Sequence, residues 1–160
     1  MAGDITARFG THSQTATITL ASLGSGSQQE MTSVDNTSDK FTDALVRVKV
    51  KTASTGVSST GYIAVYAYGS VTNGSDYGGG ATGSNASISS VDGLIHIGSF
   101  PANANGTAFI SQPFSVAAAF NNNLPAKWGI VVRNVTGAAL SSTSGDHDVK
   151  WQGVGGGSYT

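Results

Sequence analysis

Hydrophobic and polar residues alternate with a period of two along several segments of the chain, which is the pattern of half-buried antiparallel strands. In residues 44–51, three valines at alternate positions share one face, and Arg47, Lys49 and Lys51 share the other. Residues 15–20 repeat this pattern, with threonines at the outward positions. Further strands are predicted over residues 62–68, 94–100, 107–111 and 128–135, and weaker ones over 31–34, 114–116 and 148–151.

Helical patterns are nearly absent from the chain. Only residues 116–120, which hold three consecutive alanines, predict a short helical turn, and three asparagines at 121–123 end it. Strands that follow one another without helices indicate an all-β fold, an antiparallel β-sandwich. The connections are too long for simple hairpins, which favours a jelly roll and leaves an immunoglobulin-like sandwich as the second choice.

Residues 62–68 differ from the other predicted strands because both of their faces are apolar. Such a strand lies at the centre of a sheet within the fold, or a partner covers its outer face. Under the second alternative, Tyr62 and Tyr66 are candidate interface residues. Both alternatives stay open at the level of sequence.

The chain divides into an expected flexible N-terminal arm (residues 1–10), a single β-sandwich domain (residues 11–152) and a glycine-rich tail (residues 153–160). The segment 70–90 is long for a loop within a compact domain, and such loops often bind a partner. Tyr77 is the aromatic side chain within it. This tyrosine either anchors a partner or folds back onto its own sandwich.

Charge is scarce in this chain and nearly balanced. Only 11% of the residues are charged, and the formal net charge is −1. Such a balance provides no field to attract nucleic acid or an anionic membrane, so neither is an expected partner. An apolar run long enough to cross a bilayer is also absent from the sequence.

Candidate chemistry is sparse. The chain has no cysteine, and it lacks the sequence motifs of serine hydrolases, phosphate-binding loops and zinc proteases, so we expect no enzyme and no cofactor. His147 lies between two aspartates, but neighbouring strand residues point to opposite faces and do not converge on a metal. Residues 35–39 are rich in oxygen ligands, although we expect an Asx-type turn here and not a calcium site.

Several of the predicted strands together resemble a group of small virion proteins of tailed bacteriophages. The similarity lies in the general sequence character of the predicted strands over roughly residues 15–152, and not in a signature motif. The segments that carry it are residues 34–37, 43–52, 61–69, 113–120, 124–132 and 134–140. The resemblance implies a non-enzymatic head decoration, or cement, protein of the jelly-roll type. Such proteins are commonly trimeric and clamp neighbouring major capsid subunits, so the expected partner is the major capsid protein or another virion protein.

The same resemblance implies a location in the virion, which is assembled in the host cytoplasm. The two predicted arms would then tie neighbouring subunits together, because flexible ends can become ordered on a neighbour. Arg8, Phe9 and Tyr159 are the candidate contact residues there. None of these roles comes from a catalytic motif.

Two alternatives keep the β-sandwich but change its role. In the first, the chain is a tail-fibre or host-surface domain that recognises carbohydrate through exposed aromatic rings. Tyr77, Trp128 and Trp151 are the candidate rings, with Asn85 or Asp76 as hydrogen-bonding partners. In the second, it is an accessory structural protein of the tail.

Overall fold

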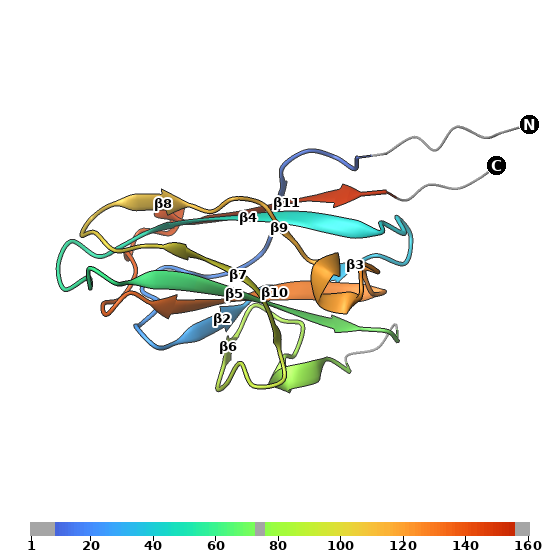
Figure 1. The fold of residues 1–160 in the computed structure, drawn as a ribbon, viewed down its shortest axis with the longest axis horizontal. Helices are drawn as coiled ribbons and strands as arrows, with labels where there is room; N and C mark the ends of the chain where they lie inside the picture. The colour runs from blue at the N-terminus through green and yellow to red at the C-terminus, as the bar shows by residue number, and fades with distance from the viewer. Residues whose placement is uncertain (1–8, 73–75, 156–160) are drawn as a thin grey trace, which may run out of the picture.

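The computed structural model describes residues 9–72 and 76–155, and it forms a sandwich of two antiparallel sheets (Figure 1). The predicted all-β sandwich is therefore confirmed. Sheet A contains β1 (Gln14–Thr15), β11 (Asp148–Val154), β4 (Asp43–Lys51) and β8 (Ala108–Ile110) in that order, with β9 (Phe114–Ser115) also paired to β4. Sheet B contains β6 (Ser87–Ile88), β2 (Gln28–Glu30), β10 (Lys127–Val135), β5 (Tyr62–Ser70) and β7 (Ile95–Pro101), with β3 (Val34–Asp35) also paired to β10.

The hydrophobic core lies between the two sheets. The alternation predicted for residues 44–51 is confirmed, because Val46, Val48 and Val50 of β4 are fully buried. Two tryptophans span the core, since Trp128 of β10 and Trp151 of β11 meet edge to face with ring centroids 5.2 Å apart. These large rings join sheet A to sheet B.

The strand predicted over residues 15–20 is wrong beyond its first residue. The N–H of Ala16 still donates to Val149 of sheet A at 2.9 Å, whereas the carbonyl of Thr17 accepts from Thr32, next to sheet B, at 2.8 Å. The chain therefore crosses from one sheet to the other here. Ala16 and Leu20 remain buried, so the apolar alternation marks inward positions in a crossing segment that forms no ladder.

Three short 3-10 helices complete the fold of the described residues. The helical turn expected over residues 116–120 is present as η2 (Ala117–Phe120), and it ends at Asn121 in the left-handed conformation, with φ of 53°. The other two were not predicted, and they are η1 (Gly78–Gly80) and η3 (Ser144–Asp146). No helix in the described ranges is long and apolar enough to span a membrane.

The two ends of the described chain lie side by side. Phe9 forms an isolated bridge with Val154, and the N–H of Gly10 donates to the carbonyl of Gly153 at 2.9 Å. Strand β11 thus continues two residues past position 152, where the sandwich domain was expected to end. Most of the predicted arm and tail lies outside the described residues.

Candidate functional surface

The outer face of sheet B is covered by the chain's own segment 76–94. Tyr68 of β5 points outward and meets Tyr77 of this segment edge to face, with ring centroids 5.3 Å apart. The hydroxyl of Tyr77 donates to Ser33 at 2.9 Å. A small second cluster forms there, with Ala81 and Val131 buried beside Tyr68. The apolar outer face of β5 is thus explained by a covering segment of the same chain.

Glu30 fastens this covering segment to sheet B. Its side chain is fully buried, and its carboxylate accepts hydrogen bonds from the N–H groups of Thr82 at 2.9 Å and Gly83 at 3.3 Å. The hydroxyl of Thr82 donates to it as well. Because a buried carboxylate without donors is costly, this set of donors fixes where the segment lies. Burial and the nearby charge of Glu30 raise the pKa of Tyr68 above its usual range.

The structure does not bring the predicted interface residues together. Tyr66 is half-buried and lies edge to face with His96 of β7, at a centroid distance of 5.2 Å. Tyr77 is packed in the covering segment described above. Tyr62 and Phe9 are exposed, at 42% and 59% of their surface. Arg8 and Tyr159 lie outside the described residues.

The aromatic rings considered for carbohydrate recognition are packed within the chain. Trp128 is fully buried and Trp151 is 7% exposed, so neither presents an open face. The side-chain oxygen of Asn85 accepts from the N–H of Thr19 and from Gln29, both at 2.8 Å. That interpretation therefore loses both tryptophans, because these rings were needed for the core.

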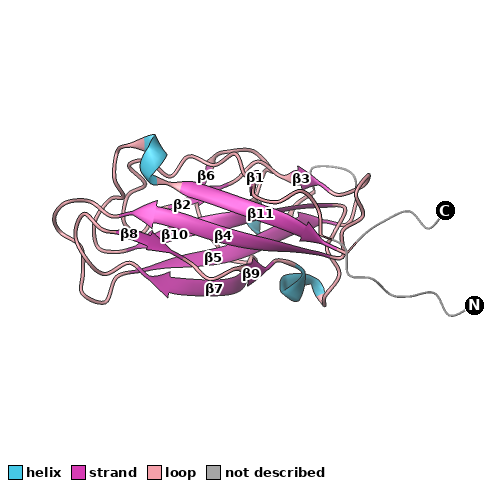
Figure 2. Ribbon diagram, turned by 90° about the horizontal axis from the view of Figure 1, so that it is seen from above, coloured by secondary structure: helices cyan, strands magenta, loops and turns pink. Residues whose placement is uncertain are grey.

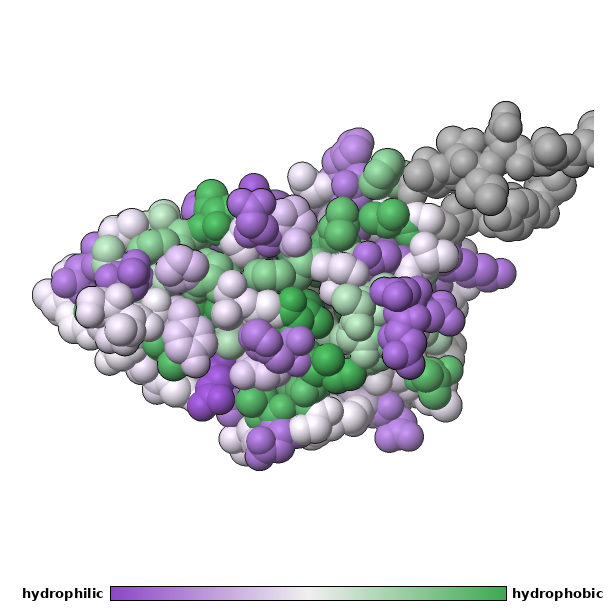
Figure 3. Space-filling view, in the orientation of Figure 1, coloured by the Kyte–Doolittle hydropathy of each residue, from purple (hydrophilic) through white to green (hydrophobic). Residues whose placement is uncertain are grey.

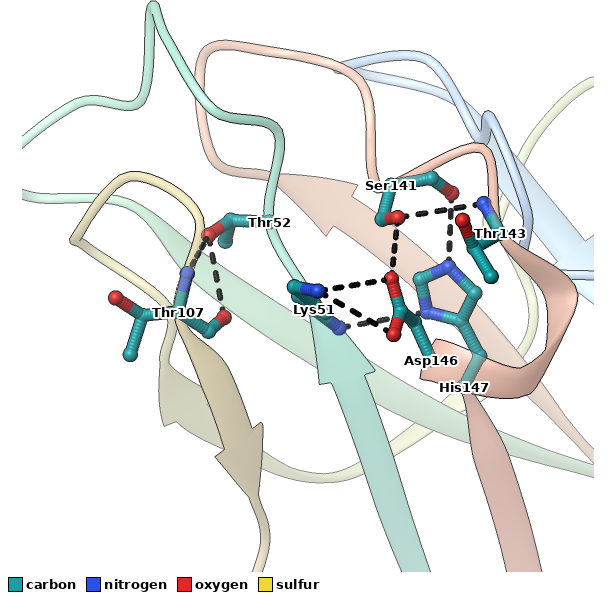
Figure 4. Close-up of polar contacts among 7 residues, drawn as sticks. All are labelled: Lys51, Thr52, Thr107, Ser141, Thr143, Asp146 and His147. Atoms are coloured by element: carbon teal, nitrogen blue, oxygen red, sulfur yellow. Dashed lines mark hydrogen bonds and ion pairs between the residues drawn. The ribbon is translucent and has the colours of Figure 1, made fainter.

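A polar cluster at one end of sheet A connects β4 to the turn before β11 (Figure 4). The carboxylate of Asp146 accepts from Ser141 at 2.6 Å and forms an ion pair with Lys51 at 3.2 Å. These contacts lower the pKa of Asp146, the hydrogen bond from Ser141 being the largest cause. The cluster ties two distant parts of the chain together.

His147 belongs to the same cluster and has both ring nitrogens engaged. Its Nδ1 accepts from the N–H of Lys51 at 3.4 Å, and its Nε2 lies 2.9 Å from the carbonyl of Ser141 (Figure 4). The hydroxyl of Ser141 bonds to Asp146 instead of the imidazole, so this serine and histidine are not arranged as nucleophile and base. Within the described ranges, no three potential metal ligands gather at one place.

The Asx-type turn expected within residues 35–39 is confirmed, and Asp35 is the residue that forms it. One carboxylate oxygen of Asp35 accepts from both the N–H of Thr37 at 2.8 Å and its hydroxyl at 2.6 Å. These hydrogen bonds lower the pKa of Asp35. The oxygen-rich sequence here serves to hold a turn.

The outer face of sheet A is open. In Figure 2, strands β4 and β11 lie on the side of the sandwich toward the viewer, and Gly10 and His12 contact this face at Gln152. The inward residues of both strands are buried, whereas Arg47 is exposed and Lys49 and Lys150 are partly exposed. The chain thus covers the outer face of one sheet and leaves basic residues at the surface of the other.

Apolar side chains gather along the side of the sandwich where β7, β8 and β9 lie (Figure 3). Ile110 of β8 is 56% exposed and Ile95 of β7 is 45% exposed. Between the sheets at this side, the ring of Phe114 packs against Gly98, leaving no room for a Cβ atom there. A bulge interrupts the pairing of β7 with β5 opposite Val65 and Tyr66, which makes β7 a poor template for another strand.

The sequence predicted the residues that β4 contributes to the open face of sheet A, but not those of β11. Its alternation placed Arg47, Lys49 and Lys51 on one outward face, but gave no information on which strand lies beside them. The weak candidate 148–151 shows the same alternation, and this signal could have matched Lys150 to the basic face. Comparison of the chain with protein-family models, curated proteins and solved structures finds no match.

Proposed function

We propose that the chain is a non-enzymatic structural protein of a tailed-phage virion, which binds the outside of the head as a decoration protein. Its partner is the major capsid protein or another virion protein. The sequence character of the strands supports this proposal, because it resembles that of small virion proteins of tailed bacteriophages. The β-sandwich is the architecture that the resemblance implies.

The observation that carries the proposal is the difference between the two sheet faces. The chain uses segment 76–94 to close the face of sheet B, and it leaves the face of sheet A open. A protein that decorates a shell needs one broad face that binds the shell. Its opposite face points to solvent and has its apolar residues covered. This division of the surface fits such a role.

Repetition over a shell makes weak contacts sufficient. The chain carries few charges, and only three ion pairs join side chains within the described ranges. Each site then contributes stability to the shell by mass action, according to the concentration of the chain relative to its Kd. Self-association adds avidity, since linked subunits engage several sites together.

The paired ends support a role for the two arms. Phe9 and Val154 are bridged, so the segments before and after them start from one place on the sandwich. In the proposal, these segments contact neighbouring subunits of a trimer through Arg8, Phe9 and Tyr159. Light scattering over a dilution series is then expected to give about three times the mass of one chain.

The test is to locate the chain on purified virions of the phage that encodes it. An antibody label viewed by electron microscopy is expected to mark the head, and stripped, expanded heads are expected to rebind the purified chain. Label on the tail alone would overturn the decoration proposal in favour of a tail component. Absence of the chain from purified virions would overturn the whole assignment.

A further inference from the structure

Two cations face each other across the centre of the open face. Arg47 of β4 and Lys150 of β11 are directly opposite in the register of sheet A, and both side chains point away from the core. Asp148 lies beside them, with its carboxylate 3.5 Å from the guanidinium of Arg47 and 3.8 Å from the ammonium of Lys150. One carboxylate is thus shared between two cations.

This arrangement runs against the usual rule for sheets. Like charges directly opposite each other destabilise a pair of strands. Lys49 adds a further cation beside them, and it forms no ion pair with any described residue. With Lys51, the face carries four of the chain's eight basic residues against Asp43, Asp146 and Asp148. Its formal charge is +1 in a chain of net charge −1, which leaves −2 for the remainder.

A shallow hollow lies next to the two cations. It has a volume of about 210 Å³. Leu45 and Pro113 supply apolar walls, and Arg47, Lys150 and Gln152 supply hydrogen-bond donors, with His12 at the rim near Gln152. The hollow therefore combines cationic donors with an apolar surface, which suits a carboxylate side chain that has an apolar neighbour.

We propose that the outer face of sheet A docks an acidic protein surface, with a carboxylate of the partner seated between Arg47 and Lys150. The inference rests on the proposed function, since the partner would be another virion protein. An arriving carboxylate relieves the repulsion that Asp148 only partly balances. Exposed Ile110, on the neighbouring strand β8 and paired with Lys49, extends the contact with apolar area.

Charge and shape on this face favour protein over nucleic acid. A net charge of +1 neutralises few phosphates, and Asp43, Asp146 and Asp148 would repel the others. The outward positions of β4 and β11 hold no aromatic side chain on which a base could stack. The apolar contribution of Leu45 and Ile110 instead matches the mixed character of protein interfaces.

Three variants with the same change of net charge test the proposal. The double variant Arg47→Gln/Lys150→Gln removes the central cations, Lys49→Glu reverses the unpaired one, and Lys40→Glu alters an exposed loop lysine as a control. Binding to stripped heads is expected to weaken about tenfold in the double variant and severalfold in Lys49→Glu, with no change in Lys40→Glu. Higher salt should weaken binding of the unaltered chain.

A second experiment tests the docking face without phage heads. An oligoglutamate peptide is titrated into the chain at low salt, and the backbone amide signals are followed by NMR, with an oligolysine peptide as control. We expect shifts at Arg47, Lys150 and Gln152 with the acidic peptide only. The heads could fail to bind the chain while the acidic peptide still shifts the signals of this face. In that case the proposed function fails, and the inference that this face docks acidic groups stands.

Three outcomes would overturn the inference. The first is head binding by the double variant equal to that of Lys40→Glu. The second is no localised shift with oligoglutamate when heads do not bind either. The third is tighter binding of a short DNA duplex than of the peptide at the same residues, which would assign the face to nucleic acid. Thermal unfolding of each variant shows whether it remains folded.

Discussion

The buried carboxylate of Glu30 accepts a hydrogen bond from the N–H of Thr82 at 2.9 Å, across 52 positions of the chain. This contact joins strand β2 to the segment that covers sheet B. It uses the only glutamate in the sequence for a structural purpose. The difference between the closed face of sheet B and the open face of sheet A depends on it.

Replacing this carboxylate should loosen the cover. In Glu30→Gln, an amide NH2 group replaces one carboxylate oxygen, and because both oxygens accept from the N–H of Thr82, a donor would then face a donor. We expect the free energy of unfolding to fall by about 1–3 kcal/mol, measured by urea denaturation. Amide hydrogen exchange should increase within residues 76–94. Asp39→Asn, which alters an exposed carboxylate, is the control, and equal effects of the two substitutions would contradict this role.

Close packing at the side of the sandwich gives a second prediction. A Cβ atom at Gly98 would lie 2.2 Å from the ring of Phe114. We expect Gly98→Ala to lower the free energy of unfolding by about 1–3 kcal/mol through overpacking. Adding Phe114→Leu should recover part of that loss, because the smaller side chain vacates the space. Gly145→Ala meets open space and serves as the control; a similar loss there would refute the packing argument.

The cluster around Asp146 predicts a pH effect. Its pKa lies below the ordinary value of 3.8, chiefly because Ser141 donates a hydrogen bond to the carboxylate. A folded-state pKa below the unfolded value stabilises the fold above the unfolded pKa. This contribution is lost as the pH falls through the folded pKa.

Removing the donor should reverse the shift. In Ser141→Ala, we expect the pKa of Asp146 to rise toward 3.8, as followed by NMR titration of its carboxyl carbon. The pKa of Asp35, whose donors come from Thr37, should stay where it is. A rise of equal size at both carboxylates would show that the hydrogen bond of Ser141 is not the cause.

Period-two alternation predicted the strands that have one buried face. Residues 44–51 were placed with the correct inward side, whereas the strands over residues 94–100 and 128–135 were predicted without an inward side. The same signal failed at residues 16–20, where burial alternates while the chain crosses between sheets. Alternation therefore reports which side is buried, and it does not report hydrogen-bond pairing.

Strand β2, which holds the covering segment 76–94 in place, was not predicted because its residues are polar. Strand β2 consists of Gln28, Gln29 and Glu30, all buried, so its sequence has the composition of a surface loop. Its partners lie more than 50 residues away, and local patterns contain no information on such contacts. The candidate docking face could be predicted only in part for the same reason. The register that sets Arg47 opposite Lys150 is a tertiary property, which the sequence of either strand does not contain.

The most direct test of the central claim is photo-crosslinking within intact virions. A photoreactive amino acid is placed at Ile110 on the open side of sheet A, or at exposed Ser89 in the segment that covers sheet B. If sheet A is the docking face, crosslinks to the major capsid protein form from position 110 and not from position 89. Crosslinks from position 89 alone, or equally from both, would contradict the account.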